Sequence, residues 1–279
     1  MTKQLKYMFR NAKCAIGFVI LAVYFLMALL GPIIFPYTGQ MESDNRYAHA
    51  SWEHPFGTDH LGRDVFTMLL SGSRNMMLIA FLTAVITVII GVFFGILSGY
   101  LGGWVDKAIM FFTNIVLTIP SFPVLMILAA LFTITDPFSF ALVLSAWGWA
   151  GLCRAVRSQI LSLRERDFIQ ICSVMGMSRM HVVFRELMPN ISSYILTNFI
   201  LIMKNAITGS VGIMLLGLAA YDPTNWGTMI EQARIQGLMN INAVRMLMYP
   251  LVAIIIFQAG AMLFSGGLDD VLNPRLRVG

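Results

Sequence analysis

Long apolar runs recur along this chain and constrain its fold more than any other feature. The runs long and apolar enough to cross a membrane are residues 15–35, 76–101, 108–134, 140–156, 191–217 and 247–266. A membrane-spanning helix needs about 20 mostly apolar residues. Because lipid offers backbone polar groups no partner, only helices and closed barrels cross it, and the alternating segments of a barrel are not visible. The sequence therefore predicts an all-α fold, a polytopic membrane helix bundle with about six transmembrane helices.

Composition excludes the soluble classes of protein. Hydrophobic residues make up 58% of the 279 residues and charged residues 12%. Soluble domains have about 45–50% and about 25% respectively. The mean hydropathy of +0.76 points the same way. A soluble globular enzyme is therefore ruled out, and the net charge of +5 is informative through its placement along the chain.

The placement of basic residues predicts the orientation of the bundle, because cytoplasmic loops carry an excess of Lys and Arg. With the N-terminus inside, the cytoplasmic segments hold Lys3, Lys6, Arg10, Lys13, Lys107, Arg154, Arg157, Arg164, Arg166, Arg179, Arg185, Arg275 and Arg277. The outer loops hold only Arg46, Arg63, Arg74, Arg234 and Arg245. We therefore expect a cytoplasmic N-terminal segment (1–14), one membrane domain (15–279) and both termini in the cytoplasm. The first run is longer than a signal-peptide core and no A-x-A site follows it, so an uncleaved first helix is expected.

Motifs that would give the chain its own chemistry are missing from the sequence. There is no GxxxxGK[ST], so the chain cannot bind ATP through a P-loop, and there is no HExxH or GxSxG. Cys14, Cys153 and Cys172 are expected to be free thiols in a reducing compartment. We expect no catalytic residue, metal or cofactor in this chain, so energy must come from a partner or an ion gradient.

The first outer loop holds a group of ligand-type side chains: His49, His54, Asp59, His60 and Asp64. A metal ion needs converging ligands, whereas Pro55 and Gly57 indicate a turn and the start of a helix. A metal site is the minor alternative here. The favoured interpretation is structural, with Asp59 as the N-cap of a helix that runs to about Ser71.

Several residues inside the apolar runs concern packing and a possible pathway. Residues 91–99 read Gly-x-x-x-Gly-x-x-x-Gly, which predicts close approach of another helix. Pro120 and Pro123 are expected to break or kink the third run, either as a pathway-lining element or as a packing kink. Lys204 is the one ionisable residue deep within a run, and such residues face a cavity or a partner rather than lipid.

The long inner loop before the fifth run predicts two short helices. Phe168, Ile171 and Met175 recur at helical spacing, so an amphipathic helix is expected to end near Gly176 as its C-cap. A second helix is expected over residues 178–189, stopped by the proline at its end. A helix lying on the membrane surface is the generic alternative.

This loop resembles the "EAA" loop of permease subunits of binding-protein-dependent ABC importers. The features that carry the resemblance are Gly176 upstream of Met188-Pro189, Asp167-Phe168 at the start, and Phe184-Arg185 and Pro189-Asn190 at the end. The chain departs from the family pattern at the Glu-Ala-Ala itself, which is replaced by Gln170-Ile171-Cys172. Residues 54–66, 216–229 and 267–277 resemble further segments of the dipeptide/oligopeptide/nickel branch, in the same order along the chain. The chain is therefore identified as similar to the second permease subunit of such an importer.

The resemblance implies a type I importer permease that forms the pathway for peptides, or similar small solutes such as metal chelates or oligosaccharides. Implied partners are a sister permease in a heterodimer, two ATPase subunits that bind ATP and Mg, and an extracytoplasmic substrate-binding protein. The implied location is the bacterial or archaeal cytoplasmic membrane. The implied ATPase-coupling residues in the loop 157–190 are Asp167, Phe168, Met175, Gly176, Arg185 and Pro189. The residues expected along the substrate pathway are Lys204, Pro120 and Pro123.

Two alternatives from other classes remain open from the residues. An ion-coupled secondary transporter would carry several intramembrane acids or an inverted repeat, and neither is seen. A membrane-embedded enzyme would carry paired catalytic residues at one depth, where this chain has only Lys204. Co-purification with ATPase subunits separates both alternatives from the importer.

Overall fold

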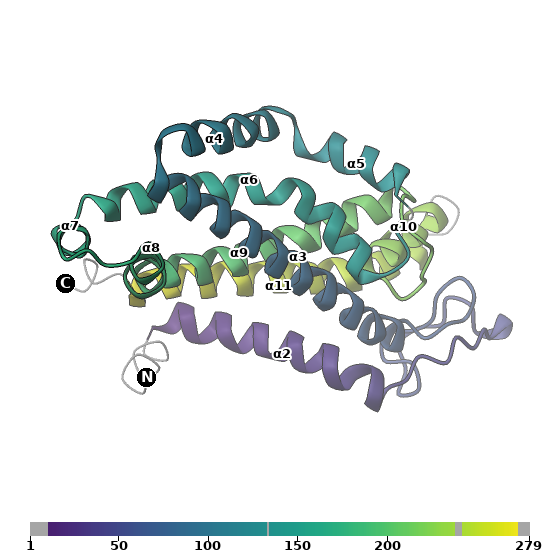
Figure 1. The fold of residues 1–279 in the computed structure, drawn as a ribbon. Helices are drawn as coiled ribbons and strands as arrows, with labels where there is room; N and C mark the ends of the chain where they lie inside the picture. Colours follow the sequence, from purple (N-terminus) through teal and green to yellow (C-terminus); the bar gives the residue numbers. More distant parts are fainter. Residues whose placement is uncertain (1–10, 133, 238–241, 273–279) are drawn as a thin grey trace.

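The computed structural model describes residues 11–132, 134–237 and 242–272, and within these ranges the chain is a helix bundle with no strand (Figure 1). The helices are α2 (Ala12–Ile34), α3 (Val65–Leu101), α4 (Gly103–Thr118), α5 (Ser121–Leu131), α6 (Pro137–Arg164), α7 (Asp167–Val174), α8 (Arg179–His181), α9 (Met188–Leu215), α10 (Trp226–Gly237) and α11 (Asn242–Leu272). A 3-10 turn, η1, covers Ser43–Asn45, and a π-helix, η2, covers Val182–Leu187. The prediction of an all-α bundle is confirmed. Lys3, Lys6, Arg10, Arg275, Arg277 and the end of the 267–277 segment lie outside the described residues.

Within the described ranges, five helices are long and apolar enough to cross a membrane, or six if the bent pair α4 and α5 counts as one span. The two helices of that pair meet at 90°. Ile119 leaves the helical conformation before Pro120, as expected for a residue that precedes proline. Pro123 lies in the first turn of α5, where a missing N–H removes no helical hydrogen bond. The expected break at these prolines is therefore present.

The start of α3 differs from the expectation. Asp64, not Asp59, caps the helix: its side chain accepts a hydrogen bond from the Thr67 N–H at 2.9 Å. Asp59 instead binds the guanidinium of Arg63. Because α3 begins at Val65 rather than near residue 76, it runs through Arg74.

The expected stop at Pro189 is wrong. The chain continues as an almost unbroken helix from Arg179 to Leu215. The π-helix η2 precedes the proline, and the Met188 N–H bonds the Val183 carbonyl across the wider i to i−5 spacing. Pro189 falls in the first turn of α9, so its ring and missing N–H are tolerated there.

The glycines of residues 91–99 bring α3 directly against α6, which confirms the predicted close approach. A Cβ at Gly91 would lie 2.9 Å from Leu152 Cβ, one at Gly95 2.7 Å from Val156 Cβ, and one at Gly99 2.8 Å from Ile160 Cβ. Separations this short do not occur between real side-chain atoms, so only glycine permits this spacing. The two helix backbones therefore define one rigid pair at the centre of the bundle.

The bundle has two distinguishable ends (Figure 1). At one end lie α7, the start of α2 and the end of α11. An ion pair between Lys13 and Asp270 at 3.6 Å joins α2 to α11 there. At the other end lie α10 and the loop of residues 36–64. We call these the α7 end and the α10 end. A smaller buried apolar cluster occupies the α7 end and joins α3, α6, α7, η2 and α9.

Candidate functional site

The turn that ends helix α7 requires a residue in the left-handed backbone conformation. Gly176 has a φ of +66°. The Met177 N–H then turns back and bonds the Cys172 carbonyl at 3.0 Å, which is the six-to-one hydrogen bond of a Schellman cap. The expected C-cap at Gly176 is confirmed, and it redirects the chain from α7 into α8.

Helix α7 presents apolar side chains on two faces. Ile169 and Cys172 are 5% and 6% exposed and pack into the cluster at the α7 end. Phe168, Ile171 and Met175 are 39%, 55% and 66% exposed. The apolar stripe singled out in the sequence therefore points away from the bundle, while the face that anchors α7 lies on its other side.

The other expected coupling residues lie at the same end and are open to contact. Asp167, Arg185 and Pro189 are exposed, and a Cβ at Gly176 would meet no atom within 4 Å. Among the described residues, neither Asp167 nor Arg185 forms an ion pair. The loop is thus held through its buried face and leaves two charges and an apolar stripe uncovered.

A groove of about 710 Å³ opens between α3, α5, α6 and α9. Lys204, half-buried near the middle of α9, lines it. Ser121 and Phe122 line it from α5, whereas Pro120 and Pro123 are not among the lining residues. The two prolines shape this wall by setting the angle between α4 and α5, and they do not contribute side chains to the groove.

Sequence reasoning missed the other polar members of the groove. Thr83 and Thr87 of α3 and Asn205 and Thr208 of α9 line it together with Lys204. Single hydroxyl or amide side chains in long apolar helices give no periodic signal, because which face they occupy depends on packing against other helices. Only the tertiary arrangement brings them beside the lysine.

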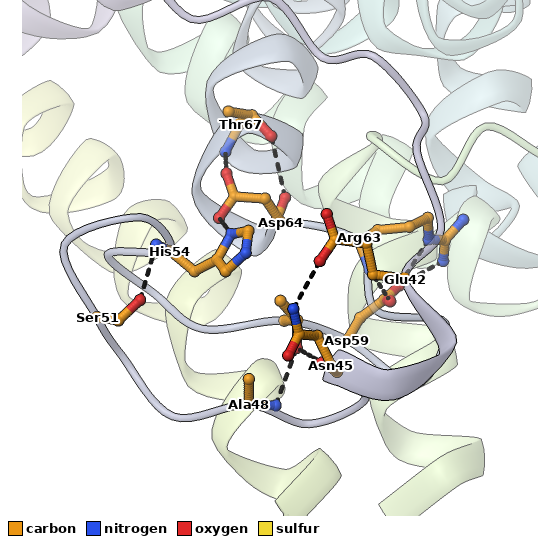
Figure 2. Close-up of polar contacts among 10 residues, drawn as sticks. Glu42, Asn45, Ala48, Ser51, His54, Asp59, Arg63, Asp64 and Thr67 are labelled. Carbon is orange, nitrogen blue, oxygen red and sulfur yellow. Dashed lines mark hydrogen bonds and ion pairs between the residues drawn. The ribbon is translucent and has the colours of Figure 1, made fainter.

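The loop of residues 36–64 is a separate polar structure at the α10 end (Figure 2). Figure 2 shows Asp64 between His54, whose Nδ1 lies 3.3 Å from its carboxylate, and the first turn of α3. Asp59 accepts hydrogen bonds from the Arg63 guanidinium at 2.6 and 2.7 Å and from the Arg63 backbone N–H at 2.9 Å. The Asp64 carboxylate therefore caps the start of α3, and the Asp59 carboxylate binds the buried guanidinium of Arg63.

The histidines of this loop do not converge on one point. His49 lies 2.8 Å from Arg245 of α11, and His60 lies 3.7 Å from Asp59. In the part of the chain that the structure describes, no three His, Cys, Asp or Glu side chains are placed to hold a metal ion. Burial lowers the pKa of His60, although the Asp59 carboxylate acts in the opposite direction. Burial alone would lower the pKa of Arg63, but its hydrogen bonds to Asp59 raise it.

Comparisons with known proteins agree with this architecture. Residues 91–278 match the family model described as "Binding-protein-dependent transport system inner membrane component". The metal-staphylopine import system permease protein of Staphylococcus aureus is 33% identical, over 98% of this chain and 93% of its own length. The dipeptide transport system permease proteins of Alkalihalophilus pseudofirmus and Bacillus subtilis are 30% and 29% identical, over 99% and 96% of this chain and 89% and 83% of their own lengths.

Proposed function

Because the chain belongs to the family of binding-protein-dependent transport system inner membrane components, and is a multi-pass ABC importer permease rather than an enzyme, we propose that it conducts peptides or similar small solutes. Support for the solute class comes from the relatives, which are named for dipeptides and for metal-staphylopine. The class is tested by identifying the ligand that the partner binding protein retains through purification. An ion-coupled transporter and a membrane enzyme are not favoured by this family.

The importer assembly we propose has the α7 end in the cytoplasm. This orientation rests on the excess of basic residues at that end, and it places both termini inside. A sister permease would complete the pathway as a heterodimer, and a substrate-binding protein would dock at the α10 end. Two ATPase subunits would bind ATP and Mg and contact the α7 end, so this chain itself needs no cofactor. The membrane would be the cytoplasmic membrane of a bacterium or archaeon.

One observation carries the coupling role of α7. Its inner face is buried in the bundle through Ile169 and Cys172, while its outer apolar stripe is uncovered. An exposed apolar stripe on a short helix that lies outside the membrane-spanning helices is suited to a protein partner. Because the inner face joins α7 to α3, α6 and α9, a push on the outer stripe moves the helices that line the groove as a rigid body.

Substitution of Gly176 tests this role. Asp and Asn have the same shape and both tolerate a positive φ, so Gly176→Asp and Gly176→Asn differ mainly in charge. We expect Gly176→Asp to abolish uptake in membranes where the complex still inserts, because its charge would face the apolar surface of the ATPase. Gly176→Asn should retain much of the uptake. Wild-type uptake by Gly176→Asp would contradict the coupling role.

A second pair of variants controls for the mere loss of an exposed apolar side chain. Met175 and Met41 have similar exposed fractions, 66% and 63%, but Met41 lies in the loop at the α10 end. Met175→Ser should lower uptake and weaken retention of the ATPase subunits during purification, while Met41→Ser should leave ATPase retention unchanged. Equal retention in both variants would show that the outer stripe of α7 does not bind the ATPase.

A further inference from the structure

We propose that the groove between α3, α5, α6 and α9 binds a carboxylate of the transported solute, with Lys204 as its cationic contact. This inference rests on the proposed import function and specifies the chemistry that the pathway selects. Its ligand is a small solute with at least one ionised carboxylate, from either a peptide C-terminus or a chelating acid.

The first argument is the uncompensated charge of Lys204. It lines a groove to which the described residues contribute no acidic side chain. Its backbone carbonyl accepts a hydrogen bond from Gln258 at 3.2 Å, which fixes α9 to α11 at this residue. An ammonium at membrane depth is costly unless it faces water or an opposite charge. A bound carboxylate supplies that charge.

The second argument is a pair of buried hydroxyls in the same groove. Thr83 and Thr87 lie one helical turn apart on α3, and neither hydroxyl has a hydrogen-bond partner among the residues that the structure describes. Opposite Thr87 the wall is Gly148, where a Cβ would lie only 3.5 Å from the threonine Oγ1. Buried hydroxyls without partners are unusual in folded proteins. Both Oγ1 atoms are enclosed in this conformation, so oxygen atoms of a solute would accept their hydrogen bonds only after a change of rotamer turns the hydroxyls toward the groove.

The contrast with Thr208 strengthens this argument. Thr208 also lines the groove, but its hydroxyl donates a hydrogen bond to the Lys204 carbonyl at 3.4 Å and accepts one from Gln258 at 2.6 Å. Its capacity is therefore used in joining α9 to α11. The donors of Thr83 and Thr87 lie on α3, which forms a different wall of the groove from the wall that carries Lys204.

The third argument is the shape and lining of the groove. Its volume of about 710 Å³ falls within the roughly 300–1,000 Å³ of small-molecule sites. Phe122, Leu125, Leu144 and Trp147 make most of the remaining wall apolar. A single cation in an apolar wall suits a solute that presents one carboxylate to the lysine, with side chains of varied shape packing elsewhere.

The attraction of an anion by Lys204 is tested by thiol modification in the assembled complex, without measuring transport. In a version with Cys14, Cys153 and Cys172 replaced by Ala, Asn205→Cys places an exposed thiol in the groove beside Lys204. We expect an anionic (sulfonatoethyl) methanethiosulfonate to modify it about five- to tenfold faster, relative to a small free thiol, than a cationic (trimethylammonioethyl) one. Lys204→Met should remove this preference and Lys204→Arg should keep it.

Lys107→Met is the matched control, because Lys107 is exposed on α4 and does not line the groove. It should leave the preference of the Asn205→Cys thiol unchanged. No anionic preference with Lys204 intact would overturn the proposal, since it would mean that an acid of the sister permease already pairs with the lysine. Weakened assembly of the Lys204→Met heterodimer would point to the same interface role and would also count against the proposal.

The solute itself is tested by uptake of paired probes. Dialanine is compared with its C-terminal amide, and nickel supplied as citrate is compared with nickel supplied as imidazole, so the two arms separate a peptide source from a chelate source. Where the carboxylate form is taken up, Lys204→Met should lower its uptake about tenfold relative to the form that lacks the carboxylate. Unchanged discrimination would overturn the proposal. If neither pair enters, the proposed solute class fails, while the thiol measurement still decides the role of Lys204.

Discussion

Replacement of Gly95 by Ala would place a methyl group inside the contact between α3 and α6. The new Cβ would lie 2.7 Å from Val156 Cβ and 2.8 Å from the Cys153 carbonyl oxygen. Neither of these atoms can rotate away, because one is fixed by its own Cα and the other belongs to the backbone. The helices must therefore separate by about 1 Å to restore ordinary contact distances.

The expected change in the free energy of unfolding of the Gly95→Ala variant is the sum of two opposing effects. Overpacking of this kind costs about 1–3 kcal/mol, and immovable neighbours place Gly95 at the upper end. Ala is favoured over Gly inside a helix by about 1 kcal/mol, so the net loss of stability is about 2 kcal/mol. Gly151 on α6 is the matched control, because a Cβ there meets no atom within 4 Å. Gly151→Ala should gain up to about 1 kcal/mol.

The assay is thermal unfolding of the two purified variant complexes in the same detergent. With about 2–4 °C per kcal/mol for a chain of this size, the Gly95→Ala variant should unfold roughly 6–12 °C below the Gly151→Ala variant. Uptake should fall with the former, because the proposed coupling requires the α3–α6 pair to carry motion from α7 to the groove. Equal stability of the two variants would refute the close packing of these helices.

Three further predictions concern the two ends of the bundle. In a version without native cysteines, Ser51→Cys should react with an impermeant thiol reagent added outside and Ser178→Cys should not, and the reverse pattern would overturn the proposed orientation. Asp64→Ala should destabilise the start of α3 by about 1 kcal/mol, seen as faster hydrogen exchange in its first turn, and unchanged exchange would rule out the cap. The pKa of His60 in the folded loop is lower than its ordinary value of 6.5. The unfolded loop therefore binds a proton at a higher pH than the folded loop does, and the stability of the folded loop falls as the pH drops through and below 6.5. Proteolysis of the loop should therefore accelerate between about pH 7.5 and about pH 5.5, and His60→Gln should remove most of that change.

Family resemblance and local sequence signals together predicted much of the fold. The local signals succeeded because each depends only on residues that are neighbours in the chain. Apolar runs of sufficient length predict membrane helices whatever surrounds them. The glycines of residues 91–99 and the positive φ of Gly176 follow from the missing Cβ. The break before Pro120 follows from the steric restriction that proline places on the residue before it.

Tertiary structure decided which of several locally equivalent choices the chain makes. The sequence predicted Asp59 as the helix cap, but the buried guanidinium of Arg63 binds Asp59, and Asp64 caps α3 instead. Local periodicity predicted an amphipathic α7, but packing against α6 and η2 buried Ile169 and left Phe168 exposed.

The groove around Lys204 shows the same limit most clearly. The sequence places one lysine in an apolar run and predicts that it faces a cavity or a partner. Thr83 and Thr87 come to line the same groove only because the glycines of α3 bring that helix against α6, which places both helices beside α9. Such a site depends on distances between segments far apart in the chain, and these distances are set by the packing of side chains in three dimensions rather than by any local pattern.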